Sequence, residues 1–247
     1  MIRRSRIRLA AALALIGLIA VASNGAVAAN EKTVDSAPFV QQVGTYDYLA
    51  SPNYQGLLPI SSILNGTTIG LGTFANLDGE MVVLNGIVYR VGTDGVPSKA
   101  SIKRLTPFMQ AVNFNPQKST RLAPNTACSA LPQVIDKLVK STAGVVAVRL
   151  SGVFFDVETR SVQAQLPPYP TLADAVSTQT KFPLGRVNAT LVGFRQGPDA
   201  RGIGAPDLHL HGLTKSLGAG GHVLSCVTGP NVLLEVEKTQ GVRVYTP

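Results

Sequence analysis

The stretch DLHLHGLTKSLGAGGHV, Asp207–Val223, has the pattern of two strands joined by a glycine-rich turn. Leucines alternate with His209 and His211, as in a strand whose two faces meet different surroundings. Gly220 and Gly221 favour a close approach of the second strand to its neighbours. The stretch also holds all three histidines of the 247-residue chain. A hairpin that gathers the histidines is therefore the first prediction.

Three histidines in this arrangement predict a metal site. His209 and His211 lie two residues apart, so a strand aims both imidazoles at one face. His222 can reach the same ion from the neighbouring strand. Three neutral imidazoles with one open position suit catalytic Zn²⁺ and are acceptable to other divalent first-row metals. The alternative is that the three histidines lie on the surface or in ordinary hydrogen bonds.

Strand-like runs continue on both sides of this hairpin. Before it come GTTIGLGTF, EMVVLNGIVYRV, AVNF and GVVAVRLSGVFFDVETRSVQAQ, the last being one long strand or two joined at Ser151-Gly152. Asn85-Gly86 predicts a two-residue hairpin turn. NATLVGFR, HVLSCVT and NVLLEVEK read as further strands. The chain is therefore expected to be rich in antiparallel sheet.

Helices are expected at three places. Residues 57–64 have the look of a short helix, and residues 131–142 carry apolar side chains at helical spacing. PYPTLADAVSTQT predicts a helix introduced by proline, with Thr171 as its N-cap. The expected fold class is α+β, with two tightly associated domains built on mixed and antiparallel sheets. Their expected bounds are 39–125 for a β-rich N-terminal domain and 126–247 for a C-terminal α/β domain carrying the histidines.

The N-terminus has the three regions of a secretory signal peptide. Arginines precede an apolar run, Leu9–Ala22, which ends in small residues. The alternative is a membrane anchor, but the run is shorter than the ~20 residues that a spanning helix needs. Residues 1–28 are thus expected to be removed after Ala28 or Ala29, and residues 29–38 to form a flexible leader. We expect an exported protein, periplasmic or secreted, with no membrane attachment after cleavage.

The net charge of the chain and its distribution indicate which kinds of partner the protein binds. The chain has 22 lysines and arginines against 14 acidic residues, a formal charge of +8; loss of the four N-terminal arginines leaves 18 against 14, or +4. No lysine- or arginine-rich run and no nucleic-acid motif is present, so nucleic acid is not an expected partner. A small anionic substrate suits the mild positive balance.

Two cysteines, Cys128 and Cys226, leave two alternatives open. In an exported protein they are expected to form a disulfide. Strand alternation from His222 instead places residues 222, 224 and 226 on one face, so the Cys226 thiol would lie near the metal.

Three further polar residues lie in apolar surroundings. Glu80 ends the turn LDGE before a buried-looking strand, and its alternative is a solvated carboxylate at a hairpin edge. Arg160 in VETRSV is otherwise an ordinary surface arginine. Thr73 in GLGTF is, by itself, a plain strand residue.

Several motifs in one order give the chain a family resemblance. From about Phe39 to about Val236 it resembles the α-acetolactate decarboxylases. The residues that carry the resemblance are GLGTFANLDGEMVVLNGIVYRV, TPF (106–108), AVRLSGVFFDVETRSV, PPYPTLADA, ATLVGFR and DLHLHGL with GGHVL.

The resemblance implies an activity and a site. It implies that His209, His211 and His222 bind Zn²⁺, and that the site lies in a cleft between two domains. Glu80 corresponds to a metal-proximal acid/base residue, Arg160 to the arginine of the same site, and Thr73 to a threonine lining it. The implied reaction is metal-dependent decarboxylation of 2-acetolactate to acetoin and CO₂, without an organic cofactor.

That chemistry fits the residue types. A metal acts as a Lewis acid toward the substrate's hydroxyl and carbonyl oxygens. Arg160 would hold the carboxylate or the developing anion, and Glu80 would deliver the proton. The expected partners are this small anionic substrate and, at most, a second copy of the chain in a homodimer. Two alternatives are a metalloenzyme of the same fold acting on another β-keto or 2-hydroxy acid, and an exported, non-catalytic metal-binding homologue.

Three departures from the family pattern bear on these expectations. Gly212 follows the histidine pair where an aromatic is common, which is expected to remove an aromatic from the site wall. A common arginine before the PY motif is absent, because this chain has QLPPY. A C-terminal tail glutamate that many members add to the metal site has no equivalent before Pro247, since Glu235 and Glu237 come too early.

Overall fold

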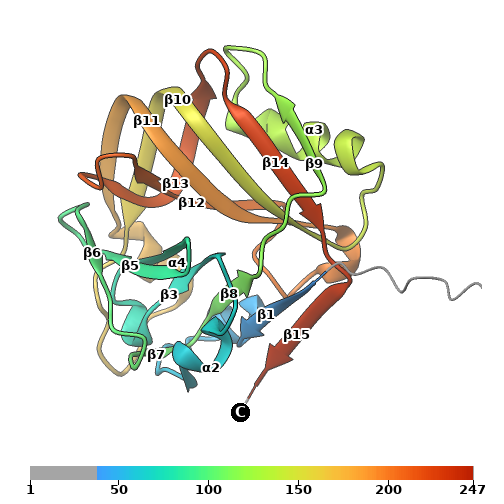
Figure 1. The fold of residues 1–247 in the computed structure, drawn as a ribbon. Helices are drawn as coiled ribbons and strands as arrows, with labels where there is room; N and C mark the ends of the chain where they lie inside the picture. Colours follow the sequence, from blue (N-terminus) through green and yellow to red (C-terminus); the bar gives the residue numbers. More distant parts are fainter. Residues whose placement is uncertain (1–37, 247) are drawn as a thin grey trace, which may run out of the picture. The chain divides into compact units, whose positions relative to one another are not determined.

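A computed structural model describes residues 38–246, which form two large sheets and one small one (Figure 1). The first sheet has seven strands in the order β15-β1-β8-β3-β4-β5-β6, and the second has six in the order β11-β12-β13-β10-β14-β9. Neighbouring strands run antiparallel, except for the parallel pair β1–β15. The expected α+β class with mixed and antiparallel sheets is confirmed. The expected signal peptide, and the leader up to residue 37, lie outside the described residues.

The first sheet contains the predicted asparagine-glycine hairpin. Its strands are β1 Phe39–Val43, β3 Ile69–Thr73, β4 Glu80–Leu84, β5 Ile87–Val91, β6 Pro97–Lys99, β8 Met109–Val112 and β15 Gly241–Tyr245. Asn85 and Gly86, between β4 and β5, have φ values of 52° and 75°. Two successive left-handed residues match the twist of the flanking strands, so the predicted turn is confirmed.

The second sheet is organised by two long strands. Its members are β9 Lys118–Arg121, β10 Val145–Ser161, β11 Thr180–Gln196, β12 Leu208–Thr214, β13 Gly220–Thr228 and β14 Leu233–Lys238. β10 is one continuous strand rather than two, and it pairs with β11 from Val145↔Gln196 to Ser161↔Thr180. β11 also pairs with β12, β12 with β13, and β13 with β10. These four strands therefore close on themselves in a ring of pairings.

The helices are short. They are α1 Tyr46–Ala50, α2 Ser61–Leu64, α3 Leu131–Val139 and α4 Leu172–Ser177, with the 3-10 turns η1 Ala75–Leu77, η2 Cys128–Ala130 and η3 Pro198–Ala200. Thr171 caps α4 as predicted, because its side chain accepts a hydrogen bond from the Asp174 N–H. The helix predicted over 57–64 is wrong in its first half, where Leu58–Pro59 forms β2 and pairs with β7, Leu105–Thr106. No helix within residues 38–246 is long and apolar enough to span a membrane.

Three clusters of buried side chains make up the core. One joins the two large sheets, since it includes Ile69 and Leu71 from β3 and Val192 and Phe194 from β11. A second lies between the second sheet and α3, and a third lies over the first sheet and α2. The described residues 38–246 belong to one compact unit. The boundary expected at residue 125 stays a prediction, and strand pairing crosses it in both directions through β9 and β15.

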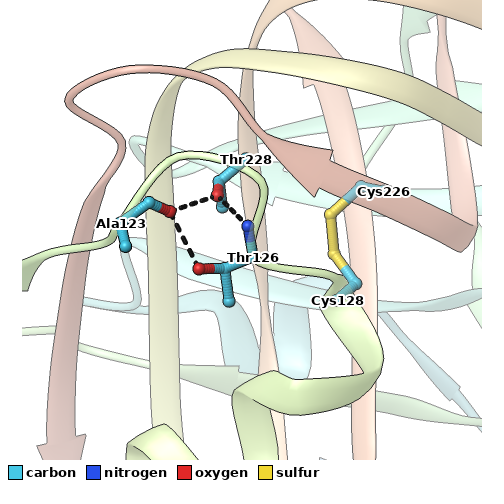
Figure 2. Close-up of a disulfide and its surroundings, with 5 residues drawn as sticks. All are labelled: Ala123, Thr126, Cys128, Cys226 and Thr228. Carbon is cyan, nitrogen blue, oxygen red and sulfur yellow. Dashed lines mark hydrogen bonds between the residues drawn. A yellow bond between two sulfur atoms is a disulfide. The ribbon is translucent and has the colours of Figure 1, made fainter.

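A disulfide joins Cys128 in η2 to Cys226 in β13 (Figure 2). Thr126 N–H donates to the Thr228 hydroxyl, and that hydroxyl donates to the carbonyl of Ala123. The expected disulfide is confirmed, and the alternative with a thiol near the metal is wrong. The strand alternation that placed residues 222, 224 and 226 on one face fails because the β10–β13 register shifts between Phe155 and Thr159. Val223 and Cys226, three residues apart, consequently meet the same core cluster.

Replacing both cysteines by serine is expected to destabilise the fold by about 2–4 kcal/mol, because a cross-link spanning 98 residues restricts the unfolded chain. The lower midpoint would be measured by urea unfolding. Wild type under a strong reductant is the matched control and should lose a similar amount. Equal midpoints for the oxidised, reduced and substituted proteins would contradict a stabilising cross-link.

Candidate metal centre

The three histidines point nitrogen atoms at one another. His209 Nε2 lies 3.1 Å from His211 Nε2 and 3.1 Å from His222 Nδ1, and the remaining edge is 3.2 Å. His211 pairs directly with His222 across β12 and β13, so both side chains share one face. His209 and His211 share that face by strand alternation. The predicted hairpin and the predicted clustering are both present.

Gly221 is required by the approach of β13 to β10. Its φ is 129°, a value that side chains rarely adopt, and a Cβ there would lie 2.5 Å from the carbonyl oxygen of Arg160. His222 follows directly and pairs with Arg160 across the strands. Glycine at this position thus places the third imidazole in line with the other two.

The hydrogen-bond partner of His211 fixes its tautomer. His211 Nδ1 lies 2.8 Å from the carbonyl oxygen of Met81, which can only accept, so Nδ1 carries the hydrogen and Nε2 presents a lone pair to the cluster. In metal sites, the histidine nitrogen that does not bind the metal usually donates a hydrogen bond to a carbonyl or carboxylate oxygen, as Nδ1 does here. Met81 belongs to β4, so a strand of the first sheet orients a candidate metal ligand that the second sheet carries.

Burial keeps the histidines neutral. Desolvation and, to a smaller extent, the positive charge of Arg160 lower the pKa of His209 to about 3. Desolvation, helped by neighbouring positive charge, also holds the pKa values of His211 and His222 well below 6.5. Neutral imidazole is the form that binds a metal ion. The electrostatics of the site therefore favour coordination over protonation.

The spacing of the three nitrogens fits a small divalent cation. Ligand nitrogens about 2.0–2.1 Å from zinc at a tetrahedral angle lie about 3.3 Å from each other, close to the 3.1–3.2 Å found here. These are the three side chains that could jointly hold a metal ion among the described residues. Lone pairs facing each other at this distance are stabilised by a cation between them.

Glu80 and Arg160 form a buried ion pair beside the histidines. Glu80 Oε1 accepts a hydrogen bond of 2.6 Å from Arg160 Nη1, and Glu80 Oε2 lies 3.4 Å from His211 Nε2. The Glu80 side chain is 6 % exposed and that of Arg160 is 13 % exposed. Burial raises the pKa of Glu80 above its usual value, while Arg160 and a hydrogen bond from the Val162 backbone oppose the rise. The carboxyl group is therefore suited to holding a proton.

Arg160 has donors to spare. Its Nη2 lies 3.3 Å from His222 Nδ1, and its Nε is buried without a hydrogen-bond partner among the described residues. Nε and Nη2 make up one edge of the guanidinium fork, which matches the two oxygens of a carboxylate. Two donors that lack a strong acceptor, next to the histidines, form an anion-binding edge.

Thr73 lies opposite Glu80 in the antiparallel pair β3–β4. Its hydroxyl donates a 2.8 Å hydrogen bond to the carbonyl oxygen of Gly79. Gly79 has a φ of 85° and directly precedes Glu80. Thr73 thus holds the turn that aims the carboxyl group, and it also lines the cavity described next.

All six residues singled out in the sequence meet in one cavity of about 610 Å³. Its polar end is formed by Thr73, Glu80, Arg160 and the three histidines, and its other walls are mainly apolar. Sequence reasoning missed these apolar walls, which come from α1, η1, α4 and Phe108, the residue before β8. The helical pattern of PTLADA gave the only signal for α4, since nothing in its residues indicated that it would cover a site.

The structure bears on two of the expected departures from the family pattern. Gly212 lies on the face opposite the histidines, where a Cβ would meet Leu191 Cδ2 at 2.4 Å. The expectation that glycine here removes an aromatic from the site wall is therefore wrong. Glu235 is paired with Arg149, and Glu237 accepts from the Asn115 N–H. Neither glutamate lines the cavity, as expected.

Glu237 gives a prediction about pH. Burial raises the pKa of this carboxyl group, so it favours folding while protonated and loses that contribution as the pH rises through the folded-state pKa. Glu237→Gln keeps an acceptor for Asn115 without the charge. The variant should be more stable than wild type at pH 7 and equal to it below pH ~4. Urea unfolding at both values checks this, and equal stability at pH 7 would contradict it.

Comparisons with known proteins agree on one family. A sequence model described as alpha-acetolactate decarboxylase matches residues 40–247. The chain is 38 % identical over 204 residues to the alpha-acetolactate decarboxylase of Methanosarcina mazei, covering 83 % of this chain and 68 % of the relative. It is 31 % identical over 188 residues to that of Bacillus subtilis strain 168, covering 76 % and 74 %. The solved structure of alpha-acetolactate decarboxylase from the same strain superimposes with a TM-score of 0.80 at 29 % identity, covering 84 % of this chain and 88 % of the other.

Proposed function

Because the chain belongs to the alpha-acetolactate decarboxylase family, we propose that it decarboxylates 2-acetolactate to acetoin and CO₂ in a zinc-dependent reaction. The chain is thus a carboxy-lyase. The observation that carries the metal dependence is the convergence of three neutral imidazole nitrogens beside the Glu80–Arg160 pair. The cavity at this point supplies room for a small acid.

His209, His211 and His222 would hold the zinc ion at the polar end of the cavity. Zinc suits three nitrogen donors, and a catalytic zinc site keeps one position open. When bound, the ion supplies Lewis acidity toward the substrate's oxygens as negative charge develops on them.

Arg160 binds the substrate anion in this proposal. Its Nε and Nη2 donors have no strong acceptor among the described residues, whereas Nη1 is engaged by Glu80. A two-point contact to the carboxylate fixes the direction in which CO₂ leaves. The charge of Arg160 also compensates the anion in a site that is otherwise poor in solvent.

Glu80 moves the proton. Replacement of CO₂ by hydrogen requires an acid next to the reacting carbon, and a carboxyl group with a raised pKa can supply one near neutral pH. Arg160 stabilises the carboxylate that remains after proton transfer. Thr73 keeps this carboxyl group in place through the turn at Gly79.

The decisive experiment measures acetoin and metal together. Purified protein is stripped with a chelator, reloaded with Zn²⁺, Mn²⁺ or Co²⁺, and incubated with each enantiomer of 2-acetolactate. We expect acetoin formation that is lost on chelation and restored by zinc. Acetoin formation at an undiminished rate by fully stripped protein would remove the metal from the proposal. Metal binding without acetoin from either enantiomer would leave a non-catalytic metal-binding homologue.

Export is part of the proposal. The N-terminal pattern of Arg3 through Ala29 is typical of a signal peptide, and the disulfide suits an oxidising compartment. Sequencing the N-terminus of protein recovered from the periplasm or medium should find a start at Ala29 or Asn30. Recovery of the intact chain from the cytosol would contradict export.

A further inference from the structure

The turn that precedes Glu80 has an unusual backbone. It joins β3 to β4 over residues 74–79, and Asn76, Leu77 and Gly79 within it have φ values of 66°, 57° and 85°. Left-handed residues other than glycine persist only where their surroundings hold them. Glu80 follows the turn directly as the first residue of β4, so the conformation of the turn decides where its carboxyl group points.

Two arginines hold this turn through one aspartate, and we call Asp78, Arg90 and Arg104 the clamp. Arg104 Nη2 donates a 2.5 Å hydrogen bond to Asp78 Oδ2. Arg90 donates through Nη2 to Asp78 Oδ1 and through Nε to the Asp78 carbonyl oxygen at 2.9 Å. The Arg104 guanidinium also lies 4.2 Å from the centre of the Phe74 ring, a favourable cation–π distance. Arg104 therefore bridges Phe74 and Asp78, which lie at opposite ends of the turn.

The clamp carries two positive charges and one negative charge. Its side chains are between 28 % and 33 % exposed, so water screens their charges only in part. Burial alone would raise the pKa of Asp78, but the hydrogen bonds and the positive charges of Arg90 and Arg104 lower it below its usual value. Asp78 is therefore ionised at neutral pH. Its charge holds together two guanidinium groups that would otherwise repel each other.

The clamp lies outside the cavity but is connected to it through β5. None of its three side chains lines the cavity that Glu80 and the histidines share. Arg90 is paired with Met81, and the next residue, Val91, is paired with Glu80. Met81 in turn accepts the hydrogen bond from the His211 ring. A shift of the turn would therefore move the Glu80 carboxyl group through the backbone, without removing any group that contacts the substrate.

We propose that Asp78 is a positioning residue for the decarboxylation. Held by the two arginines of the clamp, it fixes the turn and so keeps the Glu80 carboxyl group at the distance from which it protonates the substrate. This inference rests on the proposed function and adds to it a residue that does not touch the substrate. Proton transfer requires the acid to lie within hydrogen-bond reach of the reacting atom. A displacement of about 1 Å can therefore reduce the rate about 100-fold.

The first test is Asp78→Asn. Asparagine has nearly the shape of aspartate, but it leaves two guanidinium groups without their anion, so the turn should lose its fixed position. On zinc-loaded protein we expect kcat for 2-acetolactate to fall about 10–100-fold, while KM and zinc content stay at wild type. Backbone amides of residues 75–79 should exchange faster with deuterium, which reports on the turn independently of activity. Arg104→Lys, which keeps the positive charge, should retain more activity than Arg104→Met.

Glu235→Gln is the matched control. Glu235 accepts hydrogen bonds of 2.8 Å and 3.0 Å from Arg149, both side chains are partly buried, and neither lines the cavity. This variant breaks a comparable ion pair elsewhere in the protein, so it should lower the melting temperature as Asp78→Asn does. Its kcat and the deuterium exchange of residues 75–79 should stay at wild type.

A double-mutant cycle separates positioning from general destabilisation. If Asp78 acts through Glu80, Asp78→Asn should cause little further loss in the residual rate of Glu80→Gln. Suppose that wild type makes acetoin. An equal fold-loss in both backgrounds, or a wild-type kcat in Asp78→Asn, would then overturn the role of the clamp and leave the proposed function standing. A zinc-loaded wild type that makes no acetoin would overturn both proposals.

Discussion

Replacing His211 by alanine is expected to empty the metal centre and reduce acetoin formation to background. In the proposed site His211 provides one of three ligand nitrogens, and its ring is held by the Met81 carbonyl oxygen at 2.8 Å. Changing an outer hydrogen-bonding partner alone typically costs about 10–100-fold in metal affinity, so removal of a ligand should cost more. Zinc stoichiometry and acetoin formation in the purified variant are the measurements.

A variant of His211 could lose activity by unfolding, so two further proteins accompany it. His209→Ala removes a partly exposed ligand and should give the same loss of zinc with a smaller effect on the core. Leu224→Ala, on β13 but 37 % exposed, should retain both zinc and activity. Wild-type zinc content in both histidine variants would show that the cluster is not the metal site.

Glu80→Gln is expected to keep the metal and lose the reaction. Glutamine has nearly the shape of glutamate and can still accept from Arg160 Nη1, but its amide is not acidic enough to protonate the substrate. Removal of a general acid typically costs about 10²–10⁴-fold in rate. Steady-state kinetics on zinc-loaded protein should show the loss in kcat, with zinc content unchanged.

Glu158→Gln serves as the matched control for this substitution. Glu158 lies on β10 two residues before Arg160, and its nearest cation is Lys181 at 3.9 Å, with both side chains partly exposed. This variant should have wild-type kinetics. Full decarboxylase activity in Glu80→Gln would remove Glu80 as the proton donor and leave solvent in that role.

Alternation and turn chemistry predicted the local parts of this fold. Residues 208–214 and 220–228 form the expected hairpin, Asn85-Gly86 forms the expected turn, and Thr171 caps the expected helix. These features depend on neighbours in sequence, which a single chain displays directly. The pairing of β15 with β1 depends on contacts between residues about 200 positions apart in the sequence. No local sequence pattern predicts it.

In the candidate site, too, the local features were predicted from the sequence and the long-range contacts were not. Strand periodicity brought His209 and His211 together, and the Gly-Gly pair brought His222 to them. Glu80 and Arg160, 80 residues apart, were connected only through the family resemblance, because their contact depends on how the two sheets face each other. Alternation misplaced Cys226 because the β10–β13 register shifts twice between Phe155 and Thr159, and this irregularity interrupts the alternation of β13 between His222 and Cys226. The prediction for Gly212 was wrong because it was based on the neighbouring residue His211. Gly212 itself lies on the opposite face of β12, toward Leu191.

The ring of pairings among β10, β11, β12 and β13 should make the candidate metal centre resistant to local unfolding. β12 at His211 and β13 at His222 are paired on both edges, His209 is paired with β11, and Arg160 lies between two partners on β10. At His211 and at His222 neither strand has an unpaired edge from which it could fray. Opening of the site therefore requires breaking the second sheet itself, so backbone amides around His211 should exchange with deuterium at about the rate of global unfolding.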